Sequence, residues 1–585
     1  MPNLYCTPLG GTVRDRFVRS LAEAVVAGRG REEAYLLPSS YLLNEVRQHM
    51  RDMGLSGYEQ PNLLSFDELV DEILHLAGVR RWFMDRMTQE LLVNKVLAEV
   101  RSSVGLPYFN SIAEFPGYVS AVTSLLAEIK RTGASPDEFA AAAAAREWPA
   151  KDQEVHVIYC AYQNSLAKLG LTDLEEKYYL AIQALDAGQA ALPYRRLFIS
   201  EFYILTPLQV ELVRRLNRTV TLEIGMIYEK NRPEMFAAVE STYSELVGMG
   251  FTPYFPAVSR TSAAGLDHAR RFLFATDSVP IAADGAVEFV SSPSREKEMT
   301  VIAAKIKNLL LTGAYRPEQV AVVVRDTGIY KDFRNICGEF GIPVSLPREE
   351  QLKDQPLVRM LTNVCAARMT NGARHAVINL MKSPFCPELA GFDADDLEQR
   401  TLDHVVRTWD DWFSLFERRP GGAENSARRA SFDKLRNLVG RLPKQGTCRR
   451  LTDAFKEFVV AIAVAKRLGE ARRLGLLTQE RLKAGLLTLQ IIYDTLDEME
   501  QGFAMVGEEE KKLTLSEFLV YFHKALAGKT MILESYNASG VQVVSPAGVR
   551  GTTFRAVFVL GLTEGEFPLR DRDNWLYNEG DRTLF

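Results

Sequence analysis

Short runs of apolar and β-branched residues alternate along this chain with long helical patterns. The first set of runs predicts strands at residues 4–7, 34–38, 196–199 and 219–222. The second set predicts strands at residues 287–290, 320–324, 541–544 and 556–560. Short buried strands that alternate with helices are typical of βαβ units, so we predict an α/β fold built on mostly parallel sheets.

Two long helical stretches interrupt these sets of strands. Apolar residues at helical spacing predict helices at residues 88–100, 118–131, 152–169, 451–468 and 477–499. We therefore predict two α/β cores, each with a large all-helical insertion. The first core takes residues 1–75 and 191–280 around an insertion at 76–190. The second core takes residues 281–360 and 531–585 around an insertion at 361–530.

The length and composition agree with a multidomain protein. The chain has 585 residues, of which 47% are hydrophobic and 25% are charged, a composition that excludes disordered, collagen-like and coiled-coil classes. At roughly 100–200 residues per domain, such a chain holds about three to five domains or subdomains. The formal net charge is -5, so a basic surface for an acidic partner must come from local clustering.

The cysteines and the absence of sorting patterns bear on localisation. Six cysteines are scattered without a C-x-x-C pair, which indicates free thiols in a reducing compartment. The N-terminus lacks a secretory pattern, and no apolar run reaches the roughly 18 residues of a membrane-spanning helix. We expect a cytoplasmic protein with no membrane partner. The chain ends directly after a strongly patterned segment, so we expect it to be part of a longer protein.

The first predicted strand leads into a turn that contains Gly10, Gly11 and Thr12, and then into a helix that runs to about Val26. Such a turn can bind phosphate, because free backbone N–H groups and the helix dipole converge on the anion. A P-loop also requires a lysine that reaches the outer phosphates, and this turn lacks it. Arg14 or Arg16 could supply positive charge, so a degenerate nucleotide site and a plain strand-to-helix turn both remain open.

A single acidic residue follows the predicted strand at 196–199. A Walker B site would end this strand in two acidic residues, but Ser200 occupies the metal position and leaves only Glu201. A lone carboxylate at a strand end is commonly solvated or ion-paired, which is the alternative to a role in nucleotide binding. Thr206 and Pro207 predict the start of the next helix, with Gln209 in its first turn.

The most specific pattern lies near the C-terminus. Two predicted strands flank an R-G-x-x-F turn at residues 550–554, and the second strand runs into G-L-x-E-G-x-F-P at residues 561–568. This segment resembles motif V of UvrD-like superfamily 1 helicases. It resembles most closely the AddB component of AddAB-type helicase–nucleases, including the RexB variants. Segments at 197–209, 292–298 and 320–343 agree with this family in order and spacing, so the resemblance covers essentially the whole chain.

The resemblance implies two RecA-like cores, 1A and 2A, with helical insertions 1B and 2B. It implies an AddA-like partner subunit that is the active motor, and a complex that processes double-strand DNA ends for recombinational repair. The AddB component of this family lies along the single strand and is associated with recognition of the Chi sequence. The family's iron–sulfur nuclease domain would begin beyond Phe585, so we expect no iron–sulfur cofactor within these residues.

Several departures from active helicases make ATP hydrolysis by this chain improbable. The P-loop lysine is absent, Ser200 replaces the Walker B aspartate, and Ala547 and Thr553 replace the usual histidine and glutamate of motif V. We therefore assign no catalytic residue, and binding of ATP and Mg²⁺ is doubtful. The resemblance leaves a degenerate nucleotide site of Gly10, Gly11, Thr12, Arg14, Glu201, Gln209 and Arg550.

A basic stretch supports contact with DNA. Residues 418–473 contain fifteen Lys or Arg against five acidic residues, and such a segment can neutralise phosphates. A solvated helical face, or a docking surface for an acidic partner subunit, is the alternative. The candidate DNA-binding residues are Ser292, Arg295, Arg325, Arg428, Arg429, Arg449, Arg450, Gly551 and Phe554. The histidines form no metal-binding pattern, so we predict no metal site.

Three functions remain open from the sequence. The favoured one is a DNA-binding, non-motor scaffold within a helicase–nuclease. The second is a diverged ATP-dependent helicase that uses Arg14, Glu201 and Arg550, and the third is a structural subunit that docks a partner without touching DNA.

Overall fold

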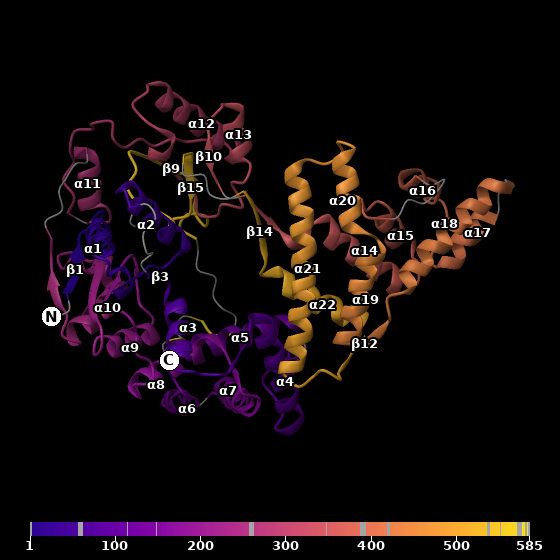
Figure 1. Cartoon of the computed structure of the whole chain (residues 1–585), viewed down its shortest axis with the longest axis horizontal. Helices are drawn as coiled ribbons and strands as arrows, with labels where there is room; N and C mark the ends of the chain where they lie inside the picture. Colours follow the sequence, from indigo (N-terminus) through magenta and orange to yellow (C-terminus); the bar gives the residue numbers. More distant parts are fainter. Residues whose placement is uncertain are drawn as a thin grey trace.

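The computed structural model has a mixed α/β architecture with two parallel sheets and many helices (Figure 1). It describes residues 3–55, 62–113, 115–147, 149–256, 263–275, 277–346, 348–386, 393–417, 422–534, 539–549, 552–569, 576–578 and 582. The α/β class predicted from the sequence is therefore confirmed.

The larger sheet has six strands in the order β3–β2–β6–β7–β1–β8, and all of its pairings are parallel. Its strands are β1 (Asn3–Thr7), β2 (Glu33–Leu36), β3 (Asn62–Leu64), β6 (Arg196–Ile199), β7 (Thr221–Ile227) and β8 (Thr252–Tyr254). The sequence predicted β1, β2, β6 and part of β7, because parallel strands that are buried on both faces read as continuous apolar runs.

Helices bury both faces of this sheet. Tyr5, Tyr35 and Phe198 pack against α1 (Arg14–Val26) and α2 (Ser40–Asp52). Their neighbours along the strands, including Leu4, Leu36 and Ile199, point to the opposite face, as the two-residue period of a strand requires. That face packs against α3 (Phe66–Leu76), α8 (Leu174–Asp186), α9 (Pro207–Leu216) and α10 (Pro233–Gly248).

The smaller sheet has four parallel strands in the order β10–β15–β9–β16. They are β9 (Val320–Val323), β10 (Val344–Ser345), β15 (Val541–Val544) and β16 (Ala556–Val559), and α12 (Arg295–Leu311) and α13 (Phe333–Glu339) pack beside them. The predicted strand at residues 287–290 is wrong. That segment has no strand neighbour among the described residues, and Glu288 accepts a hydrogen bond from Lys305 of α12 at 2.7 Å.

The first helical stretch contains α4 (Arg86–Ser103), α5 (Pro116–Arg131), α6 (Pro136–Ala144) and α7 (Ala150–Leu169). The second contains α14 (Pro356–Met369), α15 (Arg374–Met381), α16 (Ala394–Arg400), α17 (Trp409–Glu417), α18 (Gly422–Gly440), α19 (Cys448–Ala461), α20 (Val464–Arg473), α21 (Gln479–Met505) and α22 (Leu515–Ala527). The single helix predicted at 451–468 is wrong. Ala463 has a φ of +49°, which breaks the segment into α19 and α20.

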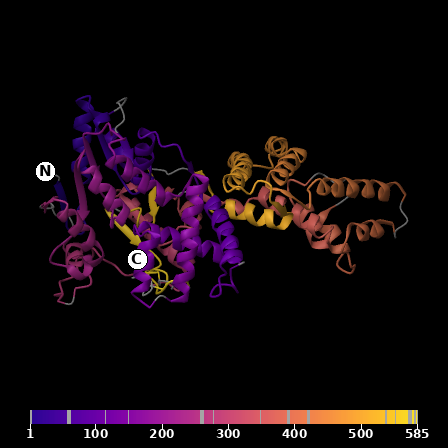
Figure 2. The same ribbon diagram turned by 90° about the horizontal axis from the view of Figure 1, so that it is seen from below.

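Short strands and one further helix complete the chain. The strand pairs are β4 (Trp82–Phe83) with β5 (Leu171–Thr172), β11 (Arg348–Gln351) with β14 (Thr530–Glu534), and β12 (Gln445–Thr447) with β13 (Lys512–Thr514). The helix is α11 (Ala264–Phe272). Figures 1 and 2 both show α14–α20 extending away from the sheets as a long arm.

The two helical stretches share one hydrophobic core. At their junction α21 approaches α4 closely, because a Cβ on Gly502 would lie 2.8 Å from Thr88 Oγ1. Lys95 of α4 donates a hydrogen bond to the carbonyl of Val506 at 2.7 Å, and Lys524 of α22 pairs with Glu90 at 3.1 Å. The boundaries of cores and insertions drawn from the sequence stay predictions, because the shared core crosses from one predicted insertion to the other.

The six cysteines are free thiols, as the sequence predicted. Burial raises the pKa of Cys337 to about 12, so this thiol stays protonated at neutral pH. Among the helices of the described residues, none combines the length and the apolar character needed to cross a bilayer.

A buried ion cluster lies between α5 and α8. The Lys130 side chain is fully buried, and its ammonium donates hydrogen bonds to Asp173 at 2.7 and 2.8 Å and to Glu176 at 3.2 Å. Asp173 also accepts from the Tyr162 hydroxyl at 2.9 Å and from the backbone N–H of Glu176 at 2.8 Å. A buried charge is stable only with such complete pairing.

We expect Lys130→Met to lower the free energy of unfolding by about 3 kcal/mol. The loss falls at the low end for a broken buried ion pair, because Tyr162 and the backbone still bind Asp173. The control is Arg400→Ala, since Arg400 and Asp396 pair at 2.7 Å while their side chains are 47% and 48% exposed, and such exposed pairs contribute about 0–1 kcal/mol. Urea unfolding followed by circular dichroism measures both, and equal losses would contradict a special role for Lys130.

Candidate functional site

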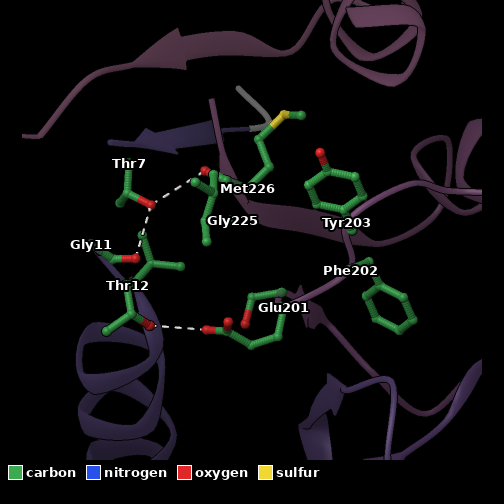
Figure 3. Close-up of a pocket in the computed structure, with 11 residues that line it drawn as sticks. Thr7, Gly11, Thr12, Glu201, Phe202, Tyr203, Gly225 and Met226 are labelled. Carbon is green, nitrogen blue, oxygen red and sulfur yellow. Dashed lines mark hydrogen bonds between the residues drawn. The ribbon is translucent and has the colours of Figure 1, made fainter. Parts of the chain in front are cut away.

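A small cavity lies at the carboxyl edge of the six-stranded sheet, where β1, β6 and β7 end and α1 begins (Figure 3). Its volume is about 70 Å³. The residues that line it are Thr7, Gly11, Thr12, Val13, Ser200, Glu201, Phe202, Tyr203, Gly225, Met226 and Ile227. The carboxyl edge of a parallel sheet is where ligands bind in open α/β folds, so this cavity is the candidate nucleotide site.

Several backbone N–H groups of the turn before α1 donate hydrogen bonds to other groups of the protein. The N–H of Leu9 donates to the Glu229 carboxylate at 2.8 Å, and the N–H of Gly11 donates to the carbonyl of Pro8 at 2.8 Å. The N–H of Arg14, at the first position of α1, donates to the Thr12 hydroxyl at 3.0 Å. These are donors of the kind that bind phosphate in a P-loop, and here the protein itself occupies them.

Thr12 and Glu201 meet across the cavity. The Thr12 hydroxyl donates to the Glu201 carboxylate at 2.9 Å, as Figure 3 shows. Glu201 has a φ of +67°, in the left-handed region that non-glycine residues seldom adopt. Backbone in such a region costs about 1–3 kcal/mol and persists where surrounding contacts hold it. The turn after β6 is thus held in a conformation that brings the only carboxylate of this strand end to Thr12.

Ser200, at the position of the expected metal ligand, is tied into the core. Its hydroxyl lies 2.6 Å from the Tyr35 hydroxyl, and both side chains are buried. Burial raises the pKa of Tyr35 above its usual range. The pair is therefore two neutral hydroxyls, and a second carboxylate is absent from this strand end.

Gly225 of β7 lets the turn approach the sheet. A Cβ on Gly225 would lie 2.1 Å from Cγ2 of Val13 and 3.2 Å from Cβ of Ser200. Val13 is buried directly before α1 and fills the space above this strand. Packing of Val13 on Gly225 therefore limits the size of the cavity.

The structure brings together five of the seven residues predicted for the nucleotide site. Gly10, Gly11, Thr12, Arg14 and Glu201 lie in the turn or beside it, and Nη1 of Arg14 is buried without a hydrogen-bond partner among the described residues. Gln209 instead caps α9, where its side chain accepts a hydrogen bond from the N–H of Thr206 at 3.0 Å. Arg550 lies outside the described residues.

Three of the predicted DNA-binding residues lie near the carboxyl edge of the smaller sheet or at the start of α12. Arg325 is exposed shortly after β9 ends, and Arg295 binds Glu566 at 2.8 Å. The hydroxyl of Ser292 is buried without a partner among the described residues. Phe554 precedes β16 and therefore lies at the opposite edge of the parallel sheet. Gly551 lies outside the described residues.

The basic stretch contributes a polar groove at the start of α19. The groove has a volume of about 390 Å³, and the residues that line it are Arg441, Pro443, Thr447, Arg449, Arg450, Asp453, Ala454 and Glu457. Arg449 pairs with Glu500 at 2.6 Å but is still 77% exposed. The stem of Arg450 lies over Gly446, 3.2 Å from where a Cβ would stand. The guanidinium groups of Arg449 and Arg450 are thus presented together at one helix N-terminus.

The remaining two predicted arginines belong to α18. Arg429 is exposed, and its guanidinium lies 5.7 Å from the centre of the Phe413 ring. Arg428 lies in α18, and its side chain is outside the described residues. Across the part of the chain that the structure describes, no group of three or more His, Cys, Asp or Glu side chains is placed to hold a metal ion.

The sequence did not single out Tyr35, Val13 or Gly225. Tyr35 reads as one more apolar position of a buried strand, and its bond to Ser200 joins residues 165 positions apart. A glycine within the β7 pattern was the one available signal, because glycine in a strand often marks a close approach of another segment.

We expect Gly225→Ala, in the larger sheet, to lower the free energy of unfolding by about 1–3 kcal/mol, the usual cost of overpacking a core. Val13→Ala in the same chain should recover part of this loss, since it removes the methyl group that the new Cβ would meet. Thermal unfolding of the two single variants and the double variant gives the coupling. Strictly additive losses would contradict the direct contact of Val13 with Gly225.

Comparison with known proteins adds the family context. Residues 17–252 match the family described as "ADDB, N-terminal". The chain is 23% identical over 580 residues to the B component of the ATP-dependent helicase/deoxyribonuclease of Desulforamulus reducens, covering 90% of this chain and 49% of that protein. The corresponding B component of Bacillus mycoides is 22% identical over 609 residues, covering 95% of this chain and 51% of that protein.

A third relative gives the same result. The B component of the ATP-dependent helicase/deoxyribonuclease of Desulforudis audaxviator is 23% identical over 584 residues, covering 91% of this chain and 49% of that protein. The chain thus spans about half the length of the curated relatives it matches. These matches confirm the resemblance that the motifs indicated: along most of its length the chain is related to the AddB-type components of ATP-dependent helicase/deoxyribonucleases.

Proposed function

We propose that this chain is a DNA-binding, non-motor part of a helicase–nuclease that processes double-strand DNA ends for recombinational repair. Its two parallel sheets would be RecA-like cores that guide a DNA strand, and an AddA-like partner would supply the motor. The observation that carries the non-motor assignment is the turn at residues 8–14, whose backbone donors and Thr12 hydroxyl bind groups of the protein itself.

The size of the cavity supports the same assignment. Sites that enclose drug-sized ligands have volumes of about 300–1,000 Å³, whereas this cavity measures about 70 Å³. Nucleotide entry would require Val13 to leave Gly225 and Thr12 to leave Glu201. A site that hydrolyses ATP also needs groups that hold magnesium and orient water, and this strand end offers Glu201 beside a serine that is bonded to Tyr35.

The groove at the start of α19 supports contact with DNA. Arg449 and Arg450 are exposed side by side beside the capped N-terminus of α19, where backbone N–H groups add positive potential. Phosphate contacts of this kind position a DNA strand without reading its sequence. The exposed Arg325, after β9, offers a further contact at the edge of the smaller sheet.

A diverged nucleotide site is the second candidate function. The observation that favours it is Nη1 of Arg14, which is buried without a hydrogen-bond partner among the described residues and would gain one from a phosphate oxygen. Docking of a partner subunit without DNA contact is the third candidate, and the acidic residues Asp453 and Glu457 in the same groove favour it.

We expect no saturable binding of a fluorescent ATP analogue with Mg²⁺ up to about 1 mM, an affinity limit near -4 kcal/mol. The physical reason is that the turn would have to give up its internal hydrogen bonds. Arg14→Ala is the control. Binding by the natural sequence that disappears in Arg14→Ala would establish the diverged nucleotide site instead.

We expect the chain to bind a duplex with a single-stranded tail, with an affinity that falls steeply as salt rises. Arg449→Ser with Arg450→Ser should reduce the slope of log K against log salt by about 1.4–1.8, since each lost phosphate contact removes roughly 0.7–0.9. Fluorescence anisotropy at several salt concentrations measures this.

The matched control is Arg316→Ser with Arg359→Ser. These arginines are 72% and 66% exposed and lie outside the basic stretch, each beside an acidic residue. An equal change of slope in the control would remove the groove from the DNA interface. Absence of binding at low salt would leave partner docking as the function.

A further inference from the structure

The segment between α3 and α4 presents an unusual surface. Residues 80–83 form a ribbon of Arg80, Arg81, Trp82 and Phe83, all exposed. Trp82 is 67% exposed, and Phe83 is 37% exposed. Large aromatic side chains are normally buried because they contribute strongly to cores. Trp409 and Trp412, the other two tryptophans within the described part of the chain, are buried accordingly.

The backbone of this ribbon is anchored although its side chains face solvent. Trp82 and Phe83 form β4, which pairs in parallel with Leu171 and Thr172 of β5, and both β5 residues are buried. The N–H of Met84 donates to the carbonyl of Thr172 at 3.0 Å. Trp82 is thus held on a strand rather than on a loose loop. A fixed platform binds a ligand without first paying the entropy of ordering itself.

The charge around the ribbon is positive. Arg80 and Arg81 have no acidic partner within the described part of the chain. The Lys177 ammonium lies 4.4 Å from the centre of the Phe83 ring. Lys177 also pairs with Asp71 at 2.7 Å, and Asp85 accepts from the N–H of Thr88 at 2.8 Å as the cap of α4. The positive charge of the ribbon therefore comes from Arg80 and Arg81.

We propose that the ribbon at residues 80–83 binds single-stranded nucleic acid, with a base stacked on Trp82 and the flanking phosphates on Arg80 and Arg81. An aromatic ring between cations is the combination that single strands require, because every base offers a stacking face and every linkage carries a negative charge. A protein partner would more commonly meet an apolar patch with a polar rim. This site is separate from the groove of α19, and it rests on the proposed function only in that both contact DNA.

The test is titration of the chain with an oligothymidylate, followed by tryptophan fluorescence and by anisotropy of the labelled strand. Stacking on Trp82 should quench the tryptophan emission. We expect Trp82→Ala to remove this quench and to weaken binding about 5- to 150-fold, as for the loss of one base–aromatic stack. Trp82→Phe should keep most of the affinity, because the phenyl ring still offers a face.

A second variant tests the phosphate contacts of the ribbon. Arg80→Ser with Arg81→Ser should weaken binding and reduce the slope of log K against log salt by about 1.4, at roughly 0.7 per phosphate of a single strand. A blunt duplex should show no dependence on Trp82. All of these side chains are exposed, so the variants should unfold at the same temperature as the natural sequence.

The matched control is Tyr108→Ala. Tyr108 is 56% exposed, but it follows the far end of α4, and the 18 residues of that helix span about 27 Å. Oligothymidylate binding that is unchanged in Trp82→Ala would overturn the proposal that residues 80–83 bind a single strand. The proposed DNA-binding function of the chain would remain. Absence of any DNA binding would overturn both, and a ribbon that contacts a protein partner would then be the remaining explanation of its exposure.

Discussion

The close approach of α21 to α4 is the contact on which the arrangement of this molecule depends. It joins helices that lie some four hundred residues apart in sequence, as the 411-residue separation of Lys95 and Val506 shows. The approach is possible because Gly502 has no side chain where Thr88 passes. The shared hydrophobic core then connects the long arm to α4, α5 and α7 of the first helical stretch.

The carboxyl edges of the two sheets differ in what they offer to a ligand. At the larger sheet, hydroxyls and backbone donors are bound to groups of the protein, and Val13 fills the space above Gly225. At the smaller sheet, Arg325 remains exposed after β9. The exposed cations of α19 and of the 80–83 ribbon lie away from both edges. In the proposed function, these exposed cations rather than the cavity of the larger sheet would therefore contact the ligand.

The sequence predicted the parallel strands well because they are buried on both faces and read as apolar runs, as in β2 and β9. It failed at residues 287–290, where an apolar run has no neighbouring strand within the part of the chain that the structure describes, since pairing depends on distant segments. It also missed the break at Ala463, because alanine favours helix and the break depends on its surroundings. The sequence predicted from their place after strands that Gly10, Gly11, Thr12 and Glu201 lie close together, whereas the packing of Val13 on Gly225 is a matter of shape that no spacing reveals.

The shared core also has a consequence for biosynthesis. The face of α4 that meets α21 is synthesised long before its partner, and at about 5–20 residues per second the interval is roughly 20–80 s. During this time α5 and α7 are the earlier elements that pack on α4 among the described residues. That face of α4 is therefore left without its partner in the nascent chain until residues 479–505 of α21 have been synthesised.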